Sequence, residues 1–423
     1  MRRVLLAVLT AAFACRPSPH QREFRLRIAV VGPLHALAPG AEPSASGYAQ
    51  EWVFERLLRT AADGAPIAGL AARFHFSTPA RVVLELREGA KFSDGSAVTA
   101  EDVRRSLRDA GLEVHEQPHG LSIESPSGVP VEPILRHESI YKRVGEAYVG
   151  SGPFRVVSLD SGRLLLRRVV HVPGKIDEVV LLGFPTAREP LAHTLAGDAD
   201  LLIVSDPKQL EFFQGVSRLR VVRAHGANAI AVAMGVHRLD RAARTAIAAA
   251  LPVESISSLV FGTECPPFSI AGGKSGALPA RPLEVLVIGQ DLPLEHTALA
   301  VARALGRSSG EIRFVSVADA FRLLKSQDFD LMMLRPLVWP PSAAAVLWAS
   351  DSPFNELGYR SPKVDAALKA GNWARALQAL HDDPPVAFIC TPERLAVVDS
   401  RIKNPQVGPY GYLETLPDWE VEE

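Results

Sequence analysis

The chain has 423 residues, of which 47% are hydrophobic and 22% are charged, and its formal net charge is -1. This length and apolar content suit roughly two or three compact units with proper hydrophobic cores, and they exclude a disordered or fibrous protein. The balanced charge gives no basic footprint, so composition does not support nucleic-acid binding.

Residues 1–15 have the pattern of an export signal, with Arg2 and Arg3 at the charged start and an apolar core over 4–14. A core of this length is too short to span a bilayer. The later sequence contains no apolar run of membrane length. Because the chain begins with an export signal, we expect it to be exported to the periplasm or cell envelope. Residues 16–24, rich in Pro, Ser and His near their start, look like a short tether.

The end of this signal has two interpretations. Ala12 and Ala14 fit the small-residue rule of ordinary signal peptidase. Cys15, directly after Ala14, instead resembles a lipobox, in which this cysteine is lipidated and becomes the mature N-terminus, although Ala12 stands where a lipobox usually has leucine. We favour the lipid anchor at Cys15, which limits membrane contact to the N-terminus.

Strand-like and helical segments alternate through almost the whole chain, a pattern typical of an α/β fold. The first half predicts, in chain order, strand 25–31, helix 48–59, strand 81–86, a hairpin of 155–157 with 164–169, strand 178–183 and helix 188–196. After 229–236 the second half predicts helices 240–251 and 254–261, strand 283–288, helix 295–305, strand 312–317, helix 318–327 and strand 330–334. Strand and helix alternate from 283 to 334, which indicates a parallel sheet.

Two cysteines remain besides Cys15, at Cys265 and Cys390. A fold of this size does not need a disulfide bond for its stability. We therefore expect two unpaired buried thiols rather than a bridge.

Residues 86–103 join a strand, a tight turn and a capped helix. Ser93-Asp94-Gly95 supplies the turn, and Thr99 can cap a helix that opens with Glu101 and Asp102. The whole stretch, LREGAKFSDGSAVTAEDV, resembles a signature of the family 5 extracellular solute-binding proteins. These are the oligopeptide, dipeptide and nickel receptors of ABC importers.

Further segments resemble the same family, and they follow the family's order from about residue 25 to the C-terminus. A single one of them is a weak signal, but their ordered sum is specific. They are 52–58 (WVFERLL), 150–154 (GSGPF), 195–200 (LAGDAD), 241–246 (RAARTA), 329–331 (FDL) with Trp339, and 359–365 (YRSPKVD).

The resemblance implies a two-lobed α/β fold, the periplasmic-binding-protein or Venus-flytrap fold of type II-like kind. Lobe I is expected to comprise 25–234 plus 396–423, and lobe II 235–395. The segment between the helix around Ser106 and Gly150 is shorter than in the family, so the extra subdomain of lobe I should be reduced.

The resemblance also implies a function without covalent chemistry or cofactor. We expect a monomeric receptor that closes around a small peptide or similar organic solute and delivers it to the permease subunits of an ABC importer. The alternative is a diverged flytrap lipoprotein that has a structural or sensory role and no transport cargo.

Four residues are candidates for ligand contact. By position in the family, Trp339 should lie near the cleft, and Tyr48 and Phe154 are weaker candidates. Arg335 can meet a ligand carboxylate bidentately. The alternative roles are a plain core position for Trp339 and pairing with a structural acid for Arg335.

The segment 338–344 lacks the aspartate with which peptide receptors often pair a peptide ammonium. A buried ammonium without a counter-charge costs several kcal/mol. Recognition of a free peptide amino group is therefore in doubt.

Two motifs of enzymes occur in incomplete form. Residues 115–119 (HEQPH) match the zinc-protease pattern HExxH, but Pro118 and Gly120 oppose the helix on which that pattern depends. Residues 272–275 (GGKS) end like a phosphate-binding loop, but Phe268 occupies the position of its first glycine. The sequence also has no G-x-S-x-G elbow, so we expect no enzyme and no metal site.

Overall fold

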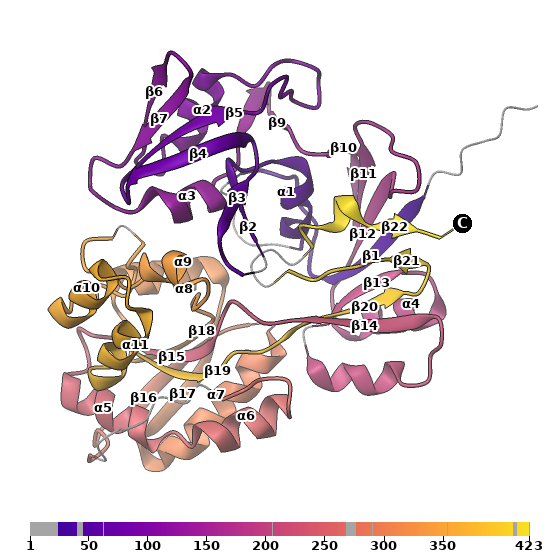
Figure 1. Cartoon of the computed structure of the whole chain (residues 1–423). Helices are drawn as coiled ribbons and strands as arrows, with labels where there is room; N and C mark the ends of the chain where they lie inside the picture. The colour runs from indigo at the N-terminus through magenta and orange to yellow at the C-terminus, as the bar shows by residue number, and fades with distance from the viewer. Residues whose placement is uncertain are drawn as a thin grey trace, which may run out of the picture.

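The computed structural model describes residues 24–39, 45–61, 63–204, 206–267, 276–289, 291–352, 354–408 and 413–422. The export signal with Cys15, nearly all of the tether and the GGKS segment lie outside these residues. The chain folds into two α/β lobes, and lobe I carries an additional subdomain, which lies above lobe II in the view of Figure 1.

Lobe I is built on a seven-stranded sheet with the order β10-β11-β12-β1-β13-β20-β14. β1 runs parallel to β12 and β13, whereas β11 and β20 are antiparallel to their neighbours. The strands are β1 (Arg25–Val31), β10 (Phe154–Asp160), β11 (Arg163–Arg168), β12 (Glu178–Phe184), β13 (Leu201–Val204), β14 (Leu219–Ala224) and β20 (Arg394–Asp399). Alternate side chains of β1 enter the two hydrophobic cores on either face of the sheet, because successive residues of a strand point to opposite faces.

One face of this sheet is covered by α1 (Gly47–Val53) and by the C-terminal tail. The indole N–H of Trp52 donates to the carbonyl of Leu413 at 2.8 Å, which ties the tail to α1. The tail contains β21 (Ile402–Lys403), η3 (Leu416–Asp418) and β22 (Glu420–Val421). The other face packs against α4 (Arg188–Ala196) and η1 (Pro207–Phe213).

The predicted helix 48–59 ends early, at Val53. Phe54 is extended, with φ -116° and ψ 115°, and the chain continues into β2 (Leu58–Thr60), which pairs with β3 (Pro66–Ala68). Leu57 and Leu58 are fully buried in the core of the subdomain, so burial in a second core overrides the helical spacing.

The subdomain has its own hydrophobic core around a four-stranded antiparallel sheet of order β4-β5-β7-β6. In this sheet the HEQPH segment is part of the hairpin between β6 and β7 rather than a helix. Thr99 and Asp102 form the expected capping box at the start of α2, with reciprocal backbone bonds of 3.3 and 3.0 Å. The elements are β4 (Ala71–Thr78), β5 (Arg81–Leu86), α2 (Ala100–Leu107), β6 (Glu113–Gln117), β7 (Gly120–Glu124), α3 (Val131–His137), β8 (Tyr141–Val144) and β9 (Ala147–Gly150).

Lobe II holds a five-stranded sheet with the order β17-β16-β18-β15-β19. The strands are β15 (Ile230–Met234), β16 (Leu283–Ile288), β17 (Ser309–Val315), β18 (Leu331–Leu334) and β19 (Val386–Cys390). β16 is parallel to β17 and to β18, as the alternation of strand and helix predicts. β15 is antiparallel to both of its neighbours, β18 and β19.

Helices cover both faces of this sheet. One core is closed by α5 (Arg241–Ala250), α6 (Val253–Phe261) and α7 (Leu292–Leu305), the last followed by η2 (Gly306–Ser308). The opposite core is closed by α8 (Val317–Ser326), α10 (Pro362–Lys369) and α11 (Trp373–Asp382). Short helix α9 (Pro341–Ala345) faces the subdomain of lobe I.

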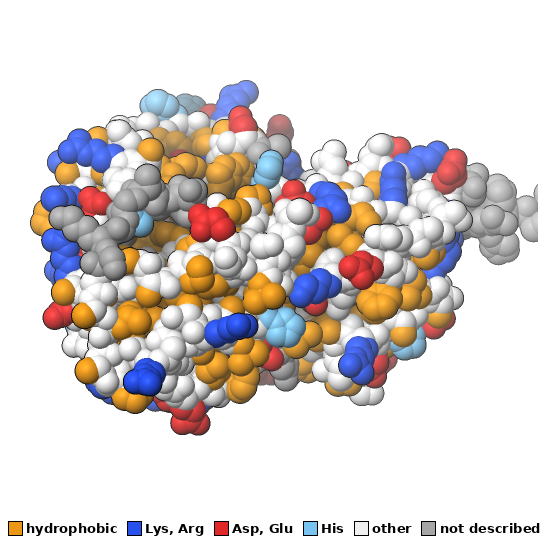
Figure 2. Space-filling model, turned by 90° about the horizontal axis from the view of Figure 1, so that it is seen from below, with side chains coloured by type: hydrophobic (Ala, Val, Ile, Leu, Met, Phe, Trp, Pro, Cys, Tyr) orange, Lys and Arg blue, Asp and Glu red, His pale blue; other side chains and the backbone are white. Residues whose placement is uncertain are grey.

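Seen from below, the molecule shows hydrophobic side chains interspersed with charged and polar ones (Figure 2). Leu259 of α6 and Leu299 of α7 are among the exposed apolar residues. Within the described residues, no single helix is long and apolar enough to cross a membrane, and only the bent pair of α5 and α6 passes that test together.

Two segments connect the lobes, one from β14 to β15 and one from β19 to β20. The predicted boundary at 234/235 is therefore several residues late, because β15 belongs to the sheet of lobe II. The predicted return at 395/396 is late as well, because β20 starts at Arg394 within the sheet of lobe I. At both boundaries an apolar strand precedes the crossing and another follows it. The sequence alone therefore does not show at which residue the chain passes from one lobe to the other.

Cys265 and Cys390 form a disulfide bond, so the prediction of two unpaired thiols is wrong. Their Cα atoms are 5.4 Å apart although 125 residues separate them in sequence. The segment after α6 lies along the end of β19, where Pro267 forms a bridge with Cys390 and the N–H of Thr391 donates to the carbonyl of Pro266. This long-range pairing brings the two sulfurs together.

Candidate functional site

A cleft of about 660 Å³ lies between the lobes, beside the two crossing segments. Its walls come from the carboxyl ends of parallel strands in both sheets, which is where open α/β sheets place their ligand sites. Lobe I contributes Val30, Val31, Tyr48, Ala187, Ile203, Val204, Pro207, Arg394 and Leu395, lobe II contributes Phe261, Asp291, Leu292 and Arg335, and the crossing segments contribute Gly226, Asn228, Pro392 and Glu393.

Arg335 lines this cleft and is held by a lobe II acid. Its Nε and Nη2 each lie 2.7 Å from an oxygen of Asp291, which makes a bidentate pair. Asp291 also caps α7 by accepting the N–H of Leu294 at 3.2 Å. Of the two roles considered for Arg335, the structure shows the pairing with a structural acid, and about a third of the side chain stays exposed to the cleft (34%).

Tyr48 lines the cleft from the first turn of α1. Burial raises the pKa of its hydroxyl above the ordinary value, and the positive charges of Arg394 and Arg335 partly oppose this effect. Arg394 also donates to the side-chain oxygen of Asn228 at 3.2 Å. The back of the cleft therefore presents a neutral phenol, an amide and a guanidinium.

Trp339 and Phe154 do not line the cleft. The backbone N–H of Trp339 donates to the carbonyl of Ala227 at 3.2 Å, and its ring lies against Gly64 of lobe I, leaving no room there for a Cβ atom. Phe154 is fully buried in the core of lobe I, beneath the guanidinium of Arg168 at 4.8 Å. Trp339 thus belongs to a contact between the lobes, and Phe154 supports the sheet.

Asn228, Asp291 and Arg394 are cleft residues that the sequence did not single out. Asp291 had a usable signal, because an aspartate two residues before a proline and four before a glutamate is typical of a helix start. Asn228 and Arg394 carry no such signal in the sequence. Asn228 lies on a crossing segment and Arg394 directly after the other one, so only the tertiary structure places them in the cleft.

One cluster of metal-binding side-chain types occurs among the described residues, at Glu113, His115 and Glu124 of the β6–β7 hairpin. These groups are already engaged with one another and with a neighbouring base: His115 lies 3.5 Å from Glu113, and Glu124 lies 3.7 Å from Arg81. The cluster is exposed and lies on a hairpin, whereas a zinc protease of the HExxH type carries its two ligating histidines on a helix.

The same two-lobed architecture occurs in solved structures. The oligopeptide-binding protein AppA from Bacillus subtilis, in complex with a nonapeptide, matches with a TM-score of 0.79 at 16% identity, covering 95% of this chain and 100% of that chain. NikA from Staphylococcus aureus, in complex with Ni(L-His)2, matches with a TM-score of 0.75 at 16% identity over 95% of this chain and 100% of that chain. The chain has the fold of ABC-transporter solute-binding proteins.

This solute-binding-protein fold confirms the architecture predicted from the sequence. NikZ from Campylobacter jejuni, in complex with Ni(L-His), gives a further match, with a TM-score of 0.75 at 16% identity over 94% of this chain and 99% of that chain. No family model matches the sequence, and the comparison with curated proteins finds no match. Identities this low establish the fold, and the ligand must be argued from the cleft itself.

Proposed function

We propose that this protein is an extracytoplasmic solute-binding protein that closes around a small peptide or similar organic solute and presents it to an ABC importer. The observation that carries the proposal is the cleft, which is formed by both lobes and lies beside the segments that join them. A solute that touches both walls stabilises the closed arrangement, because it binds that arrangement better than the open one. The nonapeptide and nickel-histidine complexes of the similar structures support this class of ligand.

The charges of the cleft favour a ligand without a free ammonium group. Among the described residues that line it, the acids are Asp291 and Glu393. Asp291 is paired with Arg335 at 2.7 Å, and Glu393 lies 3.1 Å from Arg223. An ammonium entering the cleft meets no unpaired carboxylate there, whereas ligand carbonyl or carboxylate oxygens can accept from Asn228 and the guanidinium groups.

Thermal melting of the exported protein against a panel of peptides tests the function. The panel pairs each peptide with its N-acetylated form, and native mass spectrometry of the purified protein searches for a co-purified solute. At a ligand concentration about 100 times the Kd, binding adds about 2.7 kcal/mol to the free energy of unfolding. We expect the acetylated peptides to stabilise at least as well as the free ones.

The variants Tyr48→Phe and Asn228→Ala should weaken this stabilisation. Arg360→Gln, whose side chain is 76% exposed on lobe II, should leave it unchanged. A melting temperature unmoved by peptides and by other organic solutes contradicts the proposal and favours a structural or sensory protein.

A further inference from the structure

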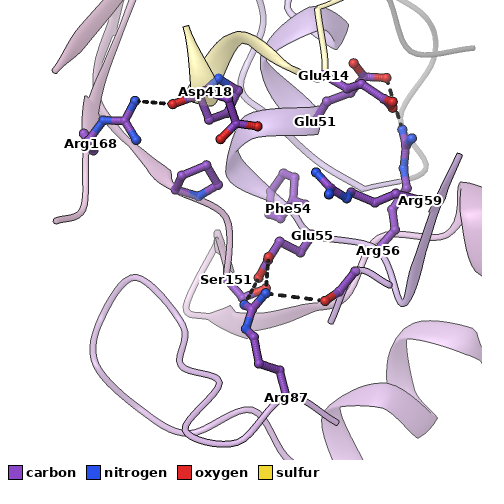
Figure 3. A pocket seen from close by; sticks show the side chains of 13 residues that line it. Glu51, Phe54, Glu55, Arg56, Arg59, Arg87, Ser151, Arg168, Glu414 and Asp418 are labelled. Atoms are coloured by element: carbon purple, nitrogen blue, oxygen red, sulfur yellow. Dashed lines mark hydrogen bonds and ion pairs between the residues drawn. The ribbon is translucent and has the colours of Figure 1, made fainter. Parts of the chain in front are cut away.

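Lobe I contains a second pocket, of about 330 Å³, that is separate from the interlobe cleft (Figure 3). Its walls come from the end of α1, the start of β2, the 151–153 turn, β11 and the tail around η3. Four arginines and four acids face it, so the pocket is charged but balanced. The lining residues are Glu51, Phe54, Glu55, Arg56, Arg59, Gly69, Arg87, Ser151, Pro153, Arg168, Glu414, Pro417 and Asp418.

Two carboxylates meet on one wall of this pocket. Glu51 and Glu414 lie side by side in Figure 3. Arg56 approaches Glu51 only to 3.5 Å, and no hydrogen bond or ion pair joins Glu414 to another residue that the structure describes. Burial and the charge of Glu51 together raise the pKa of Glu414 to about 7. The wall thus brings two carboxyl groups together, and within the described chain only Glu51 has a nearby arginine within ion-pair distance.

A guanidinium without a carboxylate partner faces them. Arg59 extends into the pocket in Figure 3, and its one hydrogen bond within the described chain runs from Nε to the carbonyl of Ala68 at 3.3 Å. Arg87 differs, because Glu55 holds both of its terminal nitrogens at 3.0 and 2.8 Å. The terminal nitrogens of Arg59 therefore remain available for an anion.

The pocket is also lined by polar atoms that no described residue satisfies. Arg56 Nε and Ser151 Oγ are buried and have no hydrogen-bond partner within the described part of the chain. Buried polar atoms usually have a partner, so an orphaned pair lining one cavity indicates that something else completes it. This observation is independent of the charges.

We propose that this pocket is a second binding site, which takes a small zwitterion carrying an ammonium and a carboxylate group. The ammonium lies between Glu51 and Glu414, and the carboxylate meets Arg59. A zwitterion fits because it relieves the repulsion of the paired acids and adds no net charge to a balanced pocket, whereas a lone ion unbalances it. The site does not depend on the transport function of the cleft.

A series of zwitterions with increasing charge separation tests the site on the full exported protein. The probes are glycine, 4-aminobutyrate and 6-aminohexanoate, with butylamine and butyrate as single-charge references, and binding is measured by calorimetry and ligand-observed NMR. We expect one zwitterion to bind at least ten times more tightly than either reference. Its affinity should increase from pH 6 to pH 8, because an ionised Glu414, which faces Glu51, Arg56, Arg59 and Arg394, holds the ammonium better.

Variants in the pocket and in the cleft show which of the two sites holds the bound probe. Glu414→Gln and Arg59→Gln should each weaken binding at least tenfold, whereas the cleft variant Asn228→Ala and the surface variant Glu146→Gln should not change it. Melting curves verify that each variant is folded, and Glu51→Gln replaces any that is not. Absence of binding to the wild-type protein at millimolar concentrations, or binding that is lost in Asn228→Ala but kept in Glu414→Gln, overturns the proposal. Neither result bears on peptide binding in the cleft.

Discussion

At the scale of single residues, the ionisable groups of this protein are mostly paired, and Glu414 is the exception with the clearest consequence. Its carboxyl is largely buried in lobe I, and its pKa is raised from the ordinary value of 4.5 to about 7. At pH values between these two pKa values, Glu414 holds a proton in the folded protein but has released it in the unfolded chain. Stability must therefore decrease as the pH rises through this range.

Glu414→Gln should remove this dependence. The free energy of unfolding of the wild type should fall, relative to that of the variant, by at most about 3 kcal/mol between roughly pH 5 and pH 8. Urea denaturation at several pH values measures it. Glu146→Gln, whose side chain is 97% exposed, is the matched control and should follow the wild type. Parallel curves for the wild type and Glu414→Gln would show that Glu414 titrates normally.

At the scale of elements, the sequence predicted what local rules determine. The capping box of α2 and the β-α-β-α-β order of lobe II both follow from residues close together in the chain. The end of α1 could not be predicted in this way. Leu57 and Leu58 continue the helical spacing in the sequence, but they are buried in the core of the subdomain, where the chain is extended. The polar residues at the back of the cleft could not be predicted either, since Asn228 and Arg394 meet there only through tertiary structure.

The disulfide is the clearest case of a feature hidden from local rules. It links the segment after α6 to the end of β19 across 125 residues. Replacing both cysteines by alanine should lower the free energy of unfolding by about 3 to 5 kcal/mol, because the unfolded chain regains a long loop. Reductant should lower the free energy of unfolding of the wild type by the same amount, and it should not lower that of the variant further. Urea denaturation with and without reductant measures both effects.

Thiol titration in denaturant provides the independent measurement for this bond. The unreduced wild-type protein should release no thiol from Cys265 or Cys390. Two titratable thiols at these positions would contradict the bridge.

At the scale of the whole molecule, side chains of the two lobes touch each other outside the cleft. Val346 of lobe II is buried in the hydrophobic core of the subdomain, near Phe354. A small cavity of about 240 Å³ separates Ile134 of α3 from Leu337 and Val346. Gly64 against Trp339 adds a second point of contact. The two lobes therefore touch each other directly, and the contact is partly apolar.

Val346→Asp should open the molecule. An aspartate in this apolar contact must regain water, so the lobes separate while each keeps its own core. Small-angle X-ray scattering should show a larger radius of gyration, and solutes of the cleft should bind more weakly. Val144→Asp, at a residue that is 52% exposed on lobe I, should change neither. An unchanged scattering curve for Val346→Asp would show that this apolar contact does not hold the lobes together.

The crossing segments determine where a ligand can act on the lobe closure that we propose. They touch each other where Gly226 meets the carbonyl of Pro392, since even a Cβ there would lie 2.0 Å from that oxygen. The disulfide and the bond from Glu393 N–H to the carbonyl of Glu264 fix the second segment to lobe II. The second segment is therefore attached to lobe II, and both segments meet the sheet of lobe I at the paired residues Ala224 and Arg394. For the proposed closure, a solute bound at Arg394 acts where the segments enter lobe I, and solute contacts farther from these segments act on a longer lever arm.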